Sequence, residues 1–579
     1  MIKNIFRKFG AVVLVMLALS CEFDKDLIDP NEIPVSGADV DLLMNGVQLD
    51  FADFYSNAQG TVAPLVRMTA MTGGYRYATA FQPQFQDGLW TTAYRALVNA
   101  ETLIPIAQEK KLTTHVGAAK IMEAYILLTM VDIFGDVPAS QALLGTKGPG
   151  SWNPAPDPGA DIYARAITLL GEAKTELAKT GTDVAGGLNR DVYYSGDKAK
   201  WTALANTLEL KAWLNISIMP SRKAEAEGKI DQFIDRMTGA LKSGVNLVDT
   251  EAENFTYKYS ATTVPDSRHP WYNQYYGPNA GQAGGYLGTS FLYEVFKGKP
   301  DPTDPGNAAK FTQDPRWRYY FYRQAGSIAQ INKIDPKALG CTPGTNPDHY
   351  LAGNYPFCVF DPGFYGRDHG DASGTPPDGP TITAVGIYPA GGRPDNTSTS
   401  NLTYATSTKR GQGADGAGIQ PIFMSFFTDY MKAEIASRAG ASDAVVKGLL
   451  ATAIQNSITQ VRNFAVSKNQ ALTIAEPSTT NYQNAVVYLY DNAANKLKII
   501  GREFWVASWG NGIEAYNSYR RTSGPDIMQP TIQVGPGPYL RSMIYPANYV
   551  NLNNNDAVQQ KDTDATVKVF WDANPDNLQ

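Results

Sequence analysis

The chain has 579 residues, with 43% hydrophobic and 18% charged side chains and a formal net charge of −6. Its 52 glycines and 36 prolines are too few for a low-complexity or collagen-like chain, and its length suffices for a large buried core. The acidic balance excludes a nucleic-acid-binding surface, which needs clustered Lys and Arg. Beyond the N-terminus, no apolar run reaches the roughly 18 residues that predict a transmembrane helix.

The first residues predict an export signal that ends in a lipid anchor. Residues 1–20 combine a basic start with the short apolar run Ala11–Leu19, as in a secretory signal peptide. Ala18–Cys21 (ALSC) resembles a bacterial lipobox, so we expect cleavage before Cys21 and acylation of its thiol, which anchors the chain in a membrane. The alternative is an ordinary signal peptide with a chance cysteine. Residues 21–35 are polar and predict a tether.

Helical periodicity dominates the next part of the chain and returns near its end. Apolar residues recur at the i, i+3, i+4 spacing of a buried helix face, and turn formers separate the segments. Consecutive helices with short connections stack as antiparallel pairs, so the sequence predicts a mainly α fold of tetratricopeptide-like helix pairs. The predicted helices are 118–134, 161–179, 198–218, 420–438, 442–467 and 494–518.

The middle of the chain has a different character. From 257 to 418 the helical pattern fades, and Gly, Pro, Asn and Asp dominate. Long irregular stretches in compact proteins are usually functional or disordered, and the many aromatic residues here favour order. We therefore predict a single domain over 36–579, in which a helical scaffold (36–256 and 419–579) carries a large loop-rich, ligand-binding insert (257–418).

Aromatic rings with polar neighbours are the candidate ligand-binding residues. The C–H face of a sugar packs on the negative face of an aromatic ring, while its hydroxyls reach amides, carboxylates or guanidinium groups. The alternative is that these rings only pack the insert against the helices. The candidates form three clusters: Tyr75, Arg76 and Tyr77; Trp271, Tyr272, Asn273, Tyr275 and Tyr276; and Phe364, Tyr365 and Arg367.

The insert also holds two cysteines and a group of carboxylates. Outside the cytoplasm, Cys341 and Cys358 are expected to form a disulfide, the alternative being two buried free thiols. Clustered carboxylates are weak candidates for a Ca²⁺ site, because their spacing differs from that of an EF-hand; pairing with Arg367 or capping of turns is the alternative. We predict no other cofactor. These carboxylates are Asp361, Asp368, Asp371 and Asp378.

Motifs of common enzyme classes are absent or stand in the wrong context. The sequence contains neither H-E-x-x-H nor G-x-S-x-G. Gly411–Gly416 matches G-x-G-x-x-G, but no strand pattern precedes it, so we interpret it as a flexible loop. The paired carboxylates of a glycosidase are defined by their separation in space, and no pair stands out in the sequence.

Several blocks, in order along the chain, resemble the SusD/RagB family of outer-membrane lipoproteins of the Bacteroidetes. The resemblance extends from about residue 90 to 572, and the acidic residues after Cys21 resemble the signal that sends such lipoproteins to the cell surface. The blocks are Ala124–Ala142, Tyr194–Leu210 (YSGDKAKWTALANTLEL), Asp314–Arg316, Phe427–Ala436, Trp505–Ser523, and Arg541–Asn553 with Phe570–Asp572.

The resemblance implies a non-enzymatic, lipid-anchored protein on the extracellular side of the outer membrane. It would capture a nutrient, with an oligosaccharide favoured over a peptide, and deliver it to a SusC-like TonB-dependent barrel. One alternative is a scaffold subunit of the same fold without its own ligand. Another, from a different class, is a surface glycan hydrolase. The family's ligand residues lie in variable loops, so the resemblance assigns none of them to a position in this chain.

Overall fold

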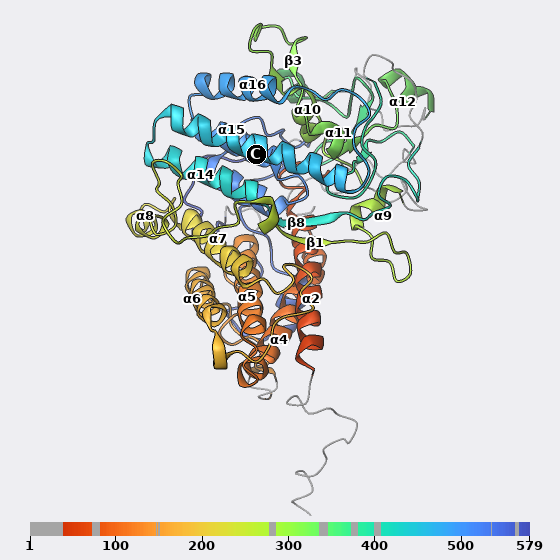
Figure 1. Ribbon diagram of the computed structural model, residues 1–579. Coiled ribbons are helices and arrows are strands. Elements are labelled where there is room, and N and C mark those ends of the chain that lie inside the picture. The colour runs from red at the N-terminus through yellow and green to blue at the C-terminus, as the bar shows by residue number, and fades with distance from the viewer. Residues whose placement is uncertain are drawn as a thin grey trace, which may run out of the picture.

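The computed structural model describes residues 39–71, 81–145, 148, 151–276, 285–334, 346–371, 380–398, 407–533, 535–561 and 567–579. The predicted signal peptide, Cys21 and the tether at 21–35 lie outside the described residues. In Figure 1, the first helices form the lower part of the molecule, and α14 (Ser425–Ala439), α15 (Asp443–Ser467) and α16 (Thr479–Asn492) lie above them.

Each helix of the first group packs on the next one along the chain, which produces a stack of antiparallel pairs. Asp39 and Asp197 accept backbone N–H groups at the starts of two of them and so fix where those helices begin. A short helix, α8 (Lys223–Ile230), follows the group. The group consists of α2 (Val40–Val62), α4 (Asp87–Glu109), α5 (Thr113–Phe134), α6 (Gly159–Ala178) and α7 (Lys198–Ile216).

Helix α5 is the centre of this stack. Every residue of α5 except Lys120 is buried, as expected for a helix that is apolar on all sides. Asp132 is its buried carboxylate near the C-terminal end, and it accepts hydrogen bonds from Asn517 Nδ2 (2.7 Å) and Trp571 Nε1 (2.9 Å) as well as from the Tyr163 hydroxyl. The neutral donors satisfy the carboxylate without an ion pair to its side chain.

The second group of helices completes the scaffold. Helix α14 packs on α7, and α18 packs on α2, so both ends of the chain contribute to one core. Helix α19 (Ala547–Leu552) lies against α4. The group consists of α14 (Ser425–Ala439), α15 (Asp443–Ser467), α16 (Thr479–Asn492), α17 (Lys496–Ala507) and α18 (Gly512–Thr522).

The segment 257–418, which we call the insert, leaves and rejoins the scaffold through one antiparallel pair, β1 (Phe255–Lys258) and β8 (Ile419–Phe423). Its other strands are two residues long and pair as β2 (Lys299–Pro300) with β3 (Phe311–Thr312), β4 (Phe321–Tyr322) with β7 (Ala384–Val385), and β5 (Val359–Phe360) with β6 (Phe364–Tyr365). Its helices are α9 (Pro270–Tyr276), α10 (Thr289–Lys297), α11 (Trp317–Tyr320), α12 (Ile328–Ile334) and α13 (Asp348–Ala352).

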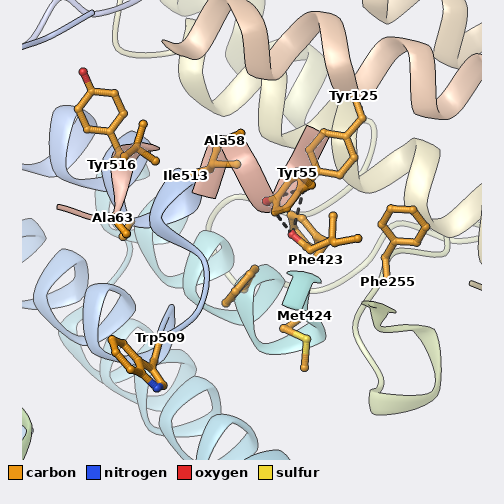
Figure 2. Close-up of a cluster of buried hydrophobic side chains, with 14 of the residues drawn as sticks. Tyr55, Ala58, Ala63, Tyr125, Phe255, Phe423, Met424, Trp509, Ile513 and Tyr516 are labelled. Carbon is orange, nitrogen blue, oxygen red and sulfur yellow. Dashed lines mark hydrogen bonds between the residues drawn. The ribbon is translucent and has the colours of Figure 1, made fainter. Parts of the chain in front are cut away.

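Polar groups hold the β1–β8 pair to the scaffold. The hydroxyls of Tyr55 in α2 and Tyr125 in α5 both donate to the carbonyl oxygen of Ile422, at 3.0 and 3.1 Å. Figure 2 shows the two rings side by side at β8, and Phe255 of β1 lies next to Tyr125. The strands that bound the insert are therefore fixed in the apolar core.

A buried ion network joins the insert to α17. Glu294 of α10 accepts hydrogen bonds from Nε and Nη2 of Arg502, each at 2.7 Å, and from Lys299. Lys299 also pairs with Glu503 at 2.9 Å. Burial raises the pKa of Glu294, but the charges of Arg502 and Lys299 outweigh it and leave the pKa below its ordinary value. The carboxylate therefore stays ionised, and the pairing positions α10.

The prediction of a mainly α fold with tetratricopeptide-like helix pairs is confirmed. Two predicted boundaries are wrong. Residues 419–423 form β8 rather than the start of the helix predicted at 420–438, and the helix predicted at 494–518 is two helices. The break falls at Gly510, whose φ of +91° no α-helix contains, and Asn511 caps α18. Among the described residues, no helix meets the length and hydropathy needed to cross a membrane.

Candidate functional site

A cavity of about 520 Å³ lies where the end of α2 meets the start of α9, and we call it the Trp271 cavity. Its volume falls within the roughly 300–1,000 Å³ typical of ligand pockets. A second hollow of about 250 Å³ also has Trp271, Ala70 and Gly60 in its lining, so the indole borders both spaces. The two hollows together form one candidate binding surface.

Helix α9 places Trp271 at this surface. Pro270 opens the helix, where its missing N–H costs nothing, and the N–H of Trp271 donates to His269 Nδ1 at 3.1 Å. The indole packs on the buried ring of Trp509, with 4.8 Å between the ring centroids. Trp509 is fixed in turn, because its Nε1 donates to the carbonyl oxygen of Tyr388 at 3.2 Å. The accessible ring therefore rests on a rigid base.

The opposite face of α9 anchors the helix in the insert. Tyr272 and Tyr276 stack with their ring centroids 4.5 Å apart and their planes within 5°. The Tyr272 hydroxyl donates to Asp415 Oδ1 at 2.8 Å, and the Tyr276 hydroxyl donates to the carbonyl oxygen of Val385 at 2.8 Å. These bonds determine the rotation of α9 and so the direction in which Trp271 faces.

The lining of the Trp271 cavity is neutral. Among the described residues, neither hollow is lined by Asp, Glu, Lys or Arg. Burial lowers the pKa of His269 from 6.5 to about 3, so its imidazole stays neutral at physiological pH. Electrostatics therefore gives this surface no preference for a charged ligand.

Polar groups that suit hydroxyl ligands line the same cavity. Asn57 and Thr61 of α2 are at least partly exposed there. Gln59 and Gln86 also line it, and among the described residues the Gln59 amide nitrogen and the Gln86 amide oxygen have no hydrogen-bond partner. A side-chain rotation would offer a donor and an acceptor to a ligand, which would remove the cost of leaving them unpaired.

The structure separates the predicted aromatic candidates. Trp271 lies at the cavity, while Asn273 donates to Asp266 Oδ2 at 3.1 Å and lines neither hollow. The other candidates of the second and third clusters are buried, although one of them, Tyr275, also borders the second hollow. These buried residues are Tyr272, Tyr275, Tyr276, Phe364, Tyr365 and Arg367.

The first cluster, Tyr75, Arg76 and Tyr77, lies outside the described residues, although Met71 and Phe81 on either side of it line the Trp271 cavity.

Cys358 is buried and disulfide-bonded, and its predicted partner Cys341 lies outside the described residues.

The aspartates of the insert have separate roles. Asp361 accepts the N–H of Ile328 at 2.9 Å, and Asp371 pairs with Arg367 at 3.3 Å. Asp368 accepts from Gln529 Nε2 at 3.0 Å, while Asp378 lies outside the described residues. Within the part of the chain that the structure describes, no group of three or more His, Cys, Asp and Glu side chains converges on a metal site. The described residues therefore do not support the Ca²⁺ candidate.

Sequence reasoning missed most of the lining. The polar residues at the end of α2 lie in a helix and look like an ordinary exposed face in the sequence. Phe85 has 63% of its surface exposed, which is unusual for a large aromatic residue, but exposure cannot be read from the sequence. Only the tertiary contact between α2, α9 and the η3 turn (Pro83–Gln86) brings these residues together.

Comparisons with known proteins agree with this fold. Residues 31–303 match a family model described as SusD-like, starch-binding associating with outer membrane. No curated protein matches the chain. A chitin-binding protein of known structure is similar at 18% identity, with a TM-score of 0.59, covering 93% of this chain and 100% of its own.

Two further solved structures have the same fold. A SusD/RagB family protein from Bacteroides thetaiotaomicron is 17% identical, with a TM-score of 0.57, and the alignment covers 90% of this chain and 95% of that one. A SusD homolog from Bacteroides uniformis is 16% identical, with a TM-score of 0.60 and coverage of 92% and 99%. At these identities the solved structures establish the shared fold.

Proposed function

We propose that this chain is a member of the SusD/RagB family that captures an oligosaccharide in the Trp271 cavity and delivers it to a SusC-like TonB-dependent transporter. A lipid on Cys21 anchors it at the cell surface, with the cavity open to the medium. The protein binds its ligand and does not transform it.

The single observation that carries the proposal is the position of Trp271 between two neutral hollows. An accessible indole on a rigid base is a surface on which the apolar face of a sugar ring stacks. The surrounding amides and hydroxyls match sugar hydroxyls, and the absence of charged lining residues in the described part of the chain favours an uncharged ligand. The starch-binding family description and the chitin-binding structural relative support the same ligand class.

The alternatives fit this cavity less well. A glycan hydrolase of the common type needs two carboxyl groups beside the scissile bond, and among its described lining residues the cavity has none. A scaffold subunit without a ligand would need neither an accessible indole nor amide groups left without partners. Both alternatives remain outcomes of the test below.

The test is calorimetric titration of the protein with chitin-derived and starch-derived oligosaccharides and with short peptides. At least one glycan series should bind, and Trp271→Ala should weaken that binding about tenfold or more. Trp152→Ala is the matched control, because Trp152 is 63% exposed and lies outside both hollows. Flat titrations across all ligands would support the scaffold alternative, and the release of shorter glycans would support the hydrolase.

Anchoring and delivery need separate experiments. Mass spectrometry of the mature N-terminus should find an acylated Cys21, and protease treatment of intact cells should remove the protein. Purification in mild detergent should retain a TonB-dependent barrel. An unacylated terminus, protection from the protease, or isolation without a barrel would each contradict the corresponding part of the proposal.

A further inference from the structure

A cavity of about 450 Å³ lies on the helical scaffold, away from the Trp271 cavity. It is formed by the ends of α7 and α14, by α8, by the start of α17 and by residues 573–575. Figure 1 shows α8 and α14 on the opposite side of the molecule from α9. The lining residues of the two cavities do not overlap, so a ligand here would be independent of one at Trp271.

Two arginines of this cavity, Arg236 and Arg438, keep unused donors. Arg236 binds Asp231 through Nε (3.0 Å) and Glu227 through Nη1 (3.2 Å). Arg438 binds Glu434 through Nε (3.0 Å) and donates from Nη2 to the carbonyl oxygen of Arg521 (2.8 Å). Among the described residues, Nη2 of Arg236 and Nη1 of Arg438 have no hydrogen-bond partner.

Both guanidinium groups are held in position. The side chains of Arg236 and Arg438 are only 24% and 22% exposed, which restricts their motion. Behind Arg438, Glu434 also pairs with the buried Arg521 at 2.9 Å. Burial raises the pKa of Glu434, but Arg521 and Arg438 outweigh it and leave the pKa below its ordinary value. The fixed anion orients Arg438 before any ligand arrives, which lowers the entropic cost of binding.

The local charge is positive, although the chain is acidic. Lys223, Arg236, Arg438 and Arg521 line the cavity, and Glu227 is the one carboxylate among its described lining residues. With Asp231 and Glu434 behind them, four cations face three carboxylates, whereas the whole chain has a net charge of −6. The N–H groups of a guanidinium match the planar geometry of a carboxylate. An anionic group therefore complements the charge of this surface.

The rest of the lining is aliphatic. Ile218, Ile435 and Leu497 border the cavity together with Leu214 and Ile230. A bare inorganic anion would leave this apolar half filled with water and would gain nothing from it. A ligand that carries a carboxylate and an apolar body would use both halves.

We propose that this cavity binds a small organic carboxylate, with its charged group at Arg236 and Arg438 and its apolar body against Ile218, Ile435 and Leu497. The proposal does not depend on the proposed function at Trp271. It assigns to the scaffold a second ligand class, for which the neutral cavity has no electrostatic preference.

The test is titration of the full mature protein with benzoate, followed by ligand-observed NMR and calorimetry. Benzyl alcohol is the uncharged control, and inorganic phosphate is the control without an apolar body. Benzoate should bind, and both controls should bind at least about tenfold more weakly, since each lacks one half of the recognised ligand. Equal binding of benzoate and benzyl alcohol, or phosphate binding as tight as benzoate binding, would overturn the proposal.

Variants then locate the site. Arg236→Gln should weaken benzoate binding about tenfold, since it removes one charge-assisted contact. Arg222→Gln is the matched control, because Arg222 lies beside α8, pairs with Glu225 and does not line the cavity. Trp271→Ala should leave benzoate binding unchanged, which separates this proposal from the glycan site. Equal affinities of wild type and Arg236→Gln would contradict it, as would the absence of benzoate binding to folded wild-type protein.

Discussion

In the scaffold, α5 satisfies its backbone groups within the helix up to its last turn, where Arg520 bonds the carbonyl oxygen of Asp132, and it buries every residue except Lys120. In the described part of the insert, most of the backbone is irregular, and buried guanidinium groups bond several of its carbonyl oxygens. Arg323 donates to the carbonyl oxygens of Pro362 at 2.8 Å and Thr397 at 3.0 Å. Arginine carries five N–H donors, so it can supply hydrogen bonds that backbone N–H groups provide in regular helices and sheets. The difference teaches that a long ordered loop region can be maintained by buried charge.

The largest expected effect tests this reading of the insert. Arg323→Met would leave Asp395 as a buried carboxylate that has lost its bonds to Arg323 Nε (2.7 Å) and Nη2 (3.0 Å). Breaking a buried pair on one side costs about 3–5 kcal/mol, so we expect a loss of that size in the free energy of unfolding from urea denaturation. Arg222→Met removes an exposed pair and should cost about 1 kcal/mol or less. If the two variants lost equal free energies of unfolding, buried charge would not be what maintains the insert.

The scaffold should be less sensitive to the loss of the buried Asp132 carboxylate. Asp132→Ala removes the acceptor of the Tyr163 hydroxyl, Asn517 Nδ2 and Trp571 Nε1, without leaving an unpaired charge on any of them. We expect a loss of about 2–3 kcal/mol in the free energy of unfolding under the same conditions. If Asp132→Ala lowered the free energy of unfolding by more than Arg323→Met does, the helices would depend on buried charge at least as much as the loops do.

Asp368 gives the insert a dependence on pH. Burial raises its pKa from 3.8 to about 7, with the charge of Asp371 adding to the effect. The folded state therefore holds the proton more strongly, so the stability from Asp368 is complete below about pH 4 and is lost as the pH rises through 7. Asp368→Asn should remove this pH dependence, and its free energy of unfolding relative to wild type should be higher at pH 8 than at pH 4 by at least about 2 kcal/mol.

Denaturation of both proteins across this pH range measures the difference. The exposed Asp361 provides the control, because Asp361→Asn in the same segment should follow the wild-type curve. A wild-type stability that does not fall between pH 4 and 8 relative to Asp368→Asn would exclude a buried, protonated Asp368.

The smallest expected effect concerns the candidate site. Trp271 is only partly buried, so Trp271→Ala should lower the free energy of unfolding by about 1 kcal/mol or less, near the usual range for surface substitutions. The substitution should therefore weaken glycan binding clearly while it changes the melting temperature only slightly. A collapse in stability would instead assign the indole to the core and remove the observation on which the proposed function rests.

Part of the helical scaffold was predictable from the sequence, because its signal is local, although α2, α4 and α16 were not among the predicted helices. The apolar stripe at 118–134 corresponds to the C-terminal three-quarters of α5, and Asp197 and Ser442 mark helix starts as N-caps do. The strand at 419–423 was not predictable in this way, since its conformation depends on pairing with β1, far away in the sequence. The break before α18 depends on one glycine inside a run with helical periodicity.

The candidate site was predictable only in part. The sequence marks a cluster of rings at 271–276, but whether a ring is exposed depends on the rotation of α9, which Asp415 and Val385 fix from distant parts of the insert. Trp271 therefore lines both hollows, Tyr275 borders only the second one, and Tyr272 and Tyr276 pack inside. The second cavity gave no signal at all, because Arg236 and Arg438 are 202 positions apart and meet only where the segment after α8 and the end of α14 line the same cavity.

The pairing of β1 with β8 means that the chain departs from the helices and returns to them at the same place. The stretch between those strands can therefore change in length and path without moving the helices, provided that it keeps the pairing of Glu294 and Lys299 with α17. The two paired strands act as a junction at which loop sequence can vary while the helical platform keeps its form.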